Sequence, residues 1–84
     1  MDPISVIGSC INLARTIYAL KQEIKSDNEA CSTFFSRIAG LQGPLEELRG
    51  MKLEVLNSRS ASIEQINAAL TNIDDVLSKR VKNQ

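Results

Sequence analysis

The apolar residues of this chain recur at a helical period almost from end to end. In the C-terminal third they are separated by three or four residues and are Ile63, Ile66, Leu70, Ile73 and Leu77. Such spacings place side chains on one face of a helix, which has about 3.6 residues per turn. No segment alternates between apolar and polar residues as a half-buried strand does. The sequence therefore predicts an all-α fold.

Three helices are expected, over residues 3–25, 27–50 or 27–56, and 61–82. Asp2 can cap the first helix, and Pro3 stands at its first position, where a backbone N–H is not needed. The segments "KSDNEA" and "NSRSAS" are rich in cap-forming residues and separate the three helices. Because the links are short, the helices should form one antiparallel bundle, a single domain over residues 1–84.

The second helix carries a regular apolar series. Its members are spaced 3-4-3-4-3 and are Cys31, Phe34, Ile38, Leu41, Leu45 and Leu48. Together with the series from Ile63 to Leu77, they form the predicted core of the bundle. Pro44 follows Gly43 within this series, lacks an N–H, and has a ring that crowds the carbonyl of Gly40. We therefore expect a kink near Pro44, with Gly43 and Pro44 as a candidate hinge.

The stretch "ISVIGSCINLA", Ile4 to Ala14, contains no charged residue in a chain of which 24% is charged. Ile4, Ile7 and Ile11 lie on its broad apolar face. The remaining strip is made of small or uncharged polar residues, namely Ser5, Gly8, Ser9 and Asn12. Two interpretations follow: the stretch is simply the central helix of the bundle, or it is held in the bundle at rest and released to enter lipid or to pair with other chains. Small residues suit close helix approach in either case.

The ten Lys and Arg residues balance ten Asp and Glu residues, which disfavours binding to nucleic acid. The densest basic cluster is Lys79, Arg80 and Lys82, and Lys21 and Lys25 could join it. These residues are candidates for contact with the anionic headgroups of a membrane. Equally, cations near a helix C-terminus are stabilised by the negative end of the helix dipole.

Enzymatic activity is not expected, because the chain has no His and one Tyr and so lacks groups for acid–base chemistry near neutral pH. No metal or other cofactor is expected either, because Cys10 and Cys31 have neither CxxC nor zinc-site spacing. In an antiparallel hairpin their sulfurs would be about 16 Å apart along the helix axes. Two reduced thiols and a cytoplasmic location are therefore predicted.

The segment "NEACSTFFSRIAGLQGPLEEL", with the preceding "INLARTIYALKQEIK" and the opening "MDPISVIG", resembles a family signature. It is similar to the N-terminal helical bundle of the mixed-lineage kinase domain-like pseudokinases and to the HeLo-type domains of fungal and plant immune proteins. The resemblance implies that the three helices are part of a four-helix bundle. It also implies a regulatory domain in the same full-length chain.

The function implied by this resemblance is a cell-death or innate-immune effector. Such bundles form homo-oligomers on activation, move from the cytoplasm to the plasma membrane, and bind and permeabilise it. A soluble adaptor that assembles with its own kind in immune signalling, and never enters lipid, is the alternative. A basic fourth helix that faces lipid would favour the effector.

Overall fold

The computed structural model describes residues 2–24 and 29–83. Its elements are α1 (Pro3–Ala19), the short 3-10 helix η1 (Leu20–Gln22), α2 (Glu29–Gly40), α3 (Gln42–Arg49), α4 (Leu53–Ser58) and α5 (Ser60–Asn83). These residues include no strand, and the all-α prediction is confirmed. The number of helices is not: five α-helices stand where three were predicted.

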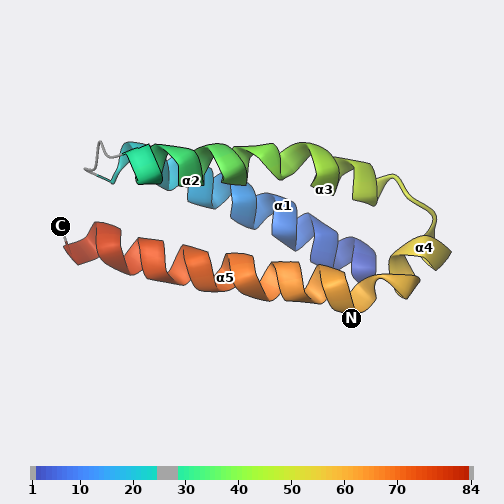
Figure 1. Cartoon of the computed structure of the whole chain (residues 1–84). Helices are drawn as coiled ribbons and strands as arrows, with labels where there is room; N and C mark the ends of the chain where they lie inside the picture. The colour runs from blue at the N-terminus through green and yellow to red at the C-terminus, as the bar shows by residue number, and fades with distance from the viewer. Residues whose placement is uncertain (1, 25–28, 84) are drawn as a thin grey trace.

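The helices form two arms on either side of α1 (Figure 1). One arm is α2 followed by α3, the other is α5, and α4 makes the corner between them. α5 runs in the same direction as α1, and the α2–α3 arm runs in the opposite direction. α1 packs most extensively on α5, then on α3 and α2, whereas within the described residues α2 and α3 make at most a weak contact with α5. The two arms are therefore held together chiefly through α1.

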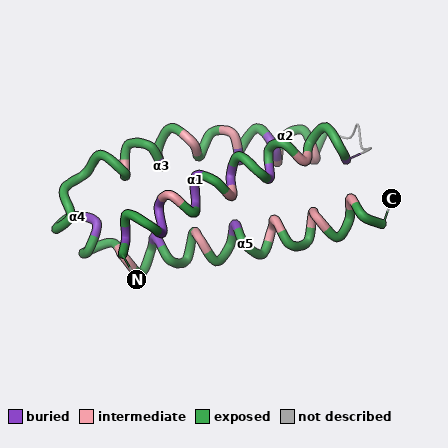
Figure 2. The backbone as a smooth tube through the Cα atoms, turned by 180° about the vertical axis from the view of Figure 1, so that it is seen from behind, coloured by how far each residue is buried: buried purple, intermediate pink, exposed green. Residues whose placement is uncertain are grey.

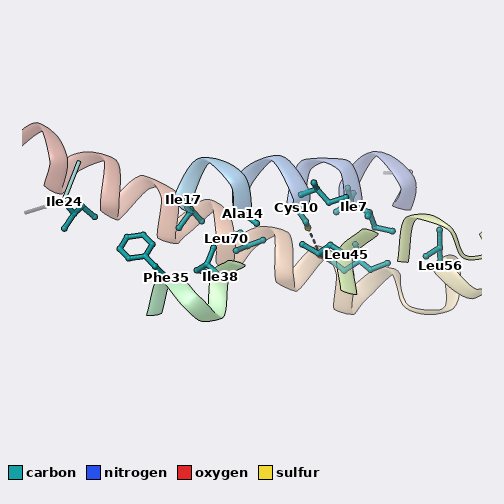
Figure 3. Close-up of a cluster of buried hydrophobic side chains, with 13 residues drawn as sticks. Ile7, Cys10, Ala14, Ile17, Ile24, Phe35, Ile38, Leu45, Leu56 and Leu70 are labelled. Carbon is teal, nitrogen blue, oxygen red and sulfur yellow. Dashed lines mark hydrogen bonds between the residues drawn. The ribbon is translucent and has the colours of Figure 1, made fainter. Parts of the chain in front are cut away.

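The buried core follows α1 along its length (Figure 2). Ile7, Cys10, Ala14 and Ile17 have no exposed surface. The other elements add the remaining large buried side chains around them, which include Phe35, Ile38, Leu45, Leu56, Ile63 and Leu70 (Figure 3). Each fully buried side chain of this size contributes about 1.5–3 kcal/mol. Most of the apolar burial in the bundle thus depends on α1.

The start of α1 agrees with the sequence. The backbone N–H of Ile4 donates to Oδ1 of Asp2 at 3.2 Å, and the Ser5 hydroxyl donates to Oδ2 at 3.3 Å. This satisfies one of the N–H groups that a helix start leaves unpaired. The end of the first predicted helix is wrong: α-helical geometry stops at Ala19, and a 3-10 turn follows. Its predicted last residue, Lys25, lies outside the described residues.

The second predicted helix is divided into α2, α3 and α4. The first break falls at Leu41, three residues before Pro44. Pro44 cannot donate to the carbonyl of Gly40, and its ring crowds that carbonyl, so α2 ends there. The Leu45 N–H donates to the Leu41 carbonyl at 3.0 Å, so helical hydrogen bonding resumes directly after the one-residue break. The predicted interruption is therefore present, although it lies ahead of the Gly43–Pro44 pair.

The continuation of this helix to residue 56 is wrong. α3 ends at Arg49, and the chain passes through Lys52, which has extended backbone angles, before α4 begins. The third predicted helix agrees closely with α5, which begins one residue earlier and ends one residue later.

The predicted core is partly correct. Its buried members are Ile38, Leu45, Ile63 and Leu70, and its partly buried members are Cys31, Phe34, Leu48, Ile73 and Leu77. Two assignments are wrong, because Leu41 and Ile66 are each 37% exposed. Leu41 occupies the break between α2 and α3. Ile66 is turned away from the core because the next residue, Asn67, contacts Cys10 of α1, and adjacent residues in a helix point about 100° apart.

The difference between Leu41 and Leu45 can be measured. Leu45 is 3% exposed, so Leu45→Ala should remove buried contacts and lower the free energy of unfolding by about 2–5 kcal/mol. Leu41→Ala, the same substitution one turn earlier at an exposed site, should cost less than about 1 kcal/mol. Urea unfolding followed by circular dichroism compares the two. Equal losses of unfolding free energy would contradict this packing and would indicate that Leu41 is a core residue, as the apolar spacing in the sequence predicts.

Candidate assembly groove and basic end

An apolar groove, here the α2–α5 groove, lies between α2 and α5. Two adjoining cavities form it, and Phe34 and Leu77 line both. The Arg80 cavity has a volume of about 330 Å³ and is completed by Ile24, Ala30, Cys31, Phe35 and Arg80. The Val76 cavity has a volume of about 260 Å³ and is completed by Asn72, Ile73 and Val76. The groove exists because the arms pack on α1 and hardly on each other.

Several side chains keep this groove apolar and accessible. Val76 is 58% exposed, the largest exposed fraction among the big hydrophobic residues described. Phe34 packs edge-to-face on Phe35, with ring centroids 5.3 Å apart and planes at 74°, and so is held at the groove wall. Ile66 lies two turns before Ile73 on the same face of α5 and is 37% exposed. A second exposed apolar residue of α5 therefore lies beyond the groove.

The structure brings together most of the basic residues picked out in the sequence. Because α1 and α5 are parallel and η1 contacts α5, Lys21 lies at the same end of the bundle as Lys79, Arg80 and Lys82. Lys25 lies outside the described residues. We refer to the four described residues as the basic end.

The charges of the basic end are not equally available. Lys79 Nζ lies 3.3 Å from Oδ2 of Asp75, and the Lys21 ammonium lies 5.6 Å from the centre of the Tyr18 ring. Arg80 is exposed and has no ion pair among the described residues, and it also lines the groove. Arg80 thus connects the basic end with the apolar groove.

The isoleucines of α1 occupy two different environments. Ile7 and Ile11 are buried, at 0% and 2% exposure, whereas Ile4 is 45% exposed. On the uncovered side of α1, Ser5 and Asn12 are exposed and uncharged. In this structure α1 is thus the central helix of the bundle, which is its resting position in both interpretations given above. The segment Pro3–Gln22 is also long and apolar enough to cross a membrane, a criterion that core helices and signal sequences meet as well.

The described residues offer little reactive chemistry. They contain no group of three or more His, Cys, Asp or Glu that could hold a metal ion. The Cys10 thiol is buried near the Ile63 carbonyl, at 4.0 Å, and Oδ1 of Asn67, at 3.8 Å. Burial raises the pKa of Cys10, because the thiolate would lose its hydration. Both cysteines are thiols, as predicted.

Comparisons of the chain with protein-family models, with curated proteins and with solved structures find no match. The family resemblance read from the sequence stays a prediction. The case for a function therefore rests on the α2–α5 groove and the basic end.

One exposed apolar region was not picked out from the sequence. Met51, Leu53 and Val55, at the corner between α3 and α5, are 40%, 51% and 38% exposed. The alternation of Met51, Leu53 and Val55 with Lys52 and Glu54 is a short exception to the helical period expected throughout the chain, and it is the signal that marks these residues.

Val76 was also not among the predicted site residues. It is adjacent to the predicted apolar series of the third helix, and its exposure depends on the distance between the two arms.

The raised pKa of Cys10 predicts a pH dependence of stability. At pH values below the ordinary thiol pKa of about 8.5, Cys10 is protonated in both the folded and the unfolded chain. Above that pH, only the unfolded chain releases the proton readily, so the free energy of unfolding should fall as the pH rises toward the higher folded pKa. Urea unfolding at pH 7 and pH 9.5 should show a larger loss for the wild type than for Cys10→Ala. Equal losses in the two proteins would contradict it.

Proposed function

We propose that this chain is a non-enzymatic assembly domain of a cell-death or innate-immune effector. It forms homo-oligomers on activation and then binds and permeabilises membranes. The observation that carries the proposal is the α2–α5 groove, an apolar surface between two arms that are held together chiefly by α1. An apolar surface of this kind on a small soluble domain is typical of a site that receives another protein segment.

A second copy of this chain is the proposed partner. On α5, Ile66 and Val76 are exposed and Ile73 between them is partly buried, so this helix offers apolar side chains that can pack into the groove of another copy. Opposite charges are equally numerous in the chain, so copies approach one another without strong net repulsion.

The membrane step is supported by the basic end and by the composition of α1. Arg80 and Lys82 are exposed at one end of the bundle, where they can meet anionic headgroups. Several copies in one oligomer multiply these weak contacts by avidity. In the membrane state we propose that Ile7 and Ile11 leave the core with α1 and contact lipid, together with Ile4. The Gly43–Pro44 region, next to the break at Leu41, is the proposed hinge for that rearrangement.

The family resemblance supports the cellular setting. It implies a chain in the cytoplasm, under the control of a regulatory domain in the full-length protein, with recruitment to the plasma membrane on activation. The proposed four-helix form of the bundle also comes from the resemblance, with a fourth helix packed against α1, the α2–α3 arm and α5.

A soluble adaptor is the second candidate function. It is favoured by the complete burial of Ile7 and by the pairing of Lys79 with Asp75, both of which suit a domain that stays folded in solution. An adaptor uses the same groove for assembly and has no membrane step.

Self-association should depend on Val76. Val76→Asp adds a charge to an exposed position in the groove, so it should leave the fold intact and weaken self-association at least tenfold. Sedimentation equilibrium over a range of protein concentrations measures the effect. Val55→Asp is the matched control, because Val55 is also exposed but lies on α4. Monomeric wild-type protein at all concentrations, or equal effects of the two substitutions, would contradict the proposed assembly.

Membrane binding should depend on the basic end. Reversing Lys79, Arg80 and Lys82 to Glu removes three contacts of about 1 kcal/mol each, so affinity for anionic vesicles should fall by about 100-fold or more. Dye release and vesicle sedimentation, with and without anionic lipid, provide the measurement. The control reverses Lys52 and Arg59 at the opposite end. Unchanged binding after reversal of the basic end would exclude its role. If folded, self-associating wild-type protein neither bound vesicles nor released dye, the soluble adaptor would be the remaining candidate function.

A further inference from the structure

We propose that the Arg80 cavity binds a single-chain anionic amphiphile, a free fatty acid, with its carboxylate on Arg80 and its acyl chain among the apolar side chains. This site goes beyond the assembly function proposed above. It is defined by the cavity itself and requires neither self-association nor a membrane.

The walls of the cavity match an acyl chain. Ile24 follows η1, Phe34 and Phe35 come from α2, and Leu77 comes from α5, so three separate segments of the chain line the space. The edge-to-face contact between the two phenylalanines fixes the shape of one wall. The remaining wall residues are Ala30 and Cys31, which add no charge. An apolar interior with one polar anchor is the usual form of a small-molecule site.

Arg80 gives the site its preference for an anion. Its guanidinium is exposed, forms no ion pair among the residues described, and is the one charged group that lines this cavity. A guanidinium binds a carboxylate through two parallel hydrogen bonds, which a neutral alcohol cannot reproduce. Charge complementarity therefore favours a fatty acid over an uncharged lipid.

The size of the cavity favours an acyl chain over a protein helix as its occupant. A helix with its side chains is about 10–12 Å across and cannot enter a space of this volume. The volume of about 330 Å³ lies at the lower end of the range of about 300–1,000 Å³ found for ligand sites. A partner helix can lie over the groove, but a single acyl chain can fill the cavity.

Calorimetric titration of the whole chain with decanoate, below the concentration at which decanoate forms micelles, tests the proposal. We expect one decanoate per chain and affinity that rises about fourfold for each added methylene until the cavity is full, in line with the transfer free energy of that group. Decyltrimethylammonium, which has the same chain and the opposite charge, should bind at least tenfold more weakly. Equal binding of both amphiphiles would overturn the proposal.

Two pairs of variants locate the site. Arg80→Gln should weaken decanoate binding about tenfold and leave decanol binding unchanged, whereas the distant control Arg59→Gln should change neither. Ala30→Leu fills the cavity from an exposed helical position and should abolish binding, while Ala61→Leu, at an exposed position on α5, should not. Circular dichroism verifies the fold of each variant. Wild-type affinity in Ala30→Leu would overturn the site.

A titration of Val76→Asp separates this proposal from self-assembly. Val76 does not line the Arg80 cavity, so the variant should bind decanoate as the wild type does, whether or not the wild type self-associates. Binding to Val76→Asp but not to self-associated wild type would assign the cavity to a second copy of the chain and overturn the fatty-acid site.

Discussion

The packing of both arms on α1 is the contact on which the rest of the bundle depends. The α2–α3 arm and the α5 arm make at most a weak contact with each other in the described part of the chain. The fully buried side chains of α1, such as Ile7 and Ile17, fill the space that the arms share. Removing α1 would therefore leave two arms without a common core. The α2–α5 groove is a direct consequence of this arrangement.

The sequence was sufficient for the helical class of the fold but not for its packing. Helical period and the Asp2 cap are local properties, so they predict helices and the start of α1 correctly. Tertiary contacts decide which of two adjacent residues in a helix is turned toward the core. The position of α1 decides that Phe35 is buried more deeply than Phe34, and that Asn67 rather than Ile66 faces α1. The effect of Pro44 on the Gly40 carbonyl predicted a kink, and the helix is interrupted beside that carbonyl, at Leu41.

The candidate site was predictable to the same extent. The cluster from Lys79 to Lys82 is visible in the sequence, and three successive antiparallel helices place Lys21 at the same end. The pairing of Lys79 with Asp75 also follows from their separation of four residues in a helix. The groove is different, because its volume depends on how far α2 and α5 stand apart. No pattern of residues within one helix contains that distance.

The proposed transfer of α1 to a membrane can be judged by comparing two free energies: the burial lost when α1 leaves the bundle, and the attraction of the basic end to anionic headgroups. Withdrawing α1 into lipid uncovers the core side chains of the arms, among them Phe35, Leu45 and Leu70, each worth about 1.5–3 kcal/mol of burial. The basic end supplies about 1 kcal/mol for each residue near an anionic surface. Attraction to headgroups is therefore too weak to extract α1 from one bundle. In the proposed mechanism, other helices take over the contacts of the arms while α1 leaves. Assembly would then precede insertion, and the apolar groove between the arms is where such helices would begin to pack.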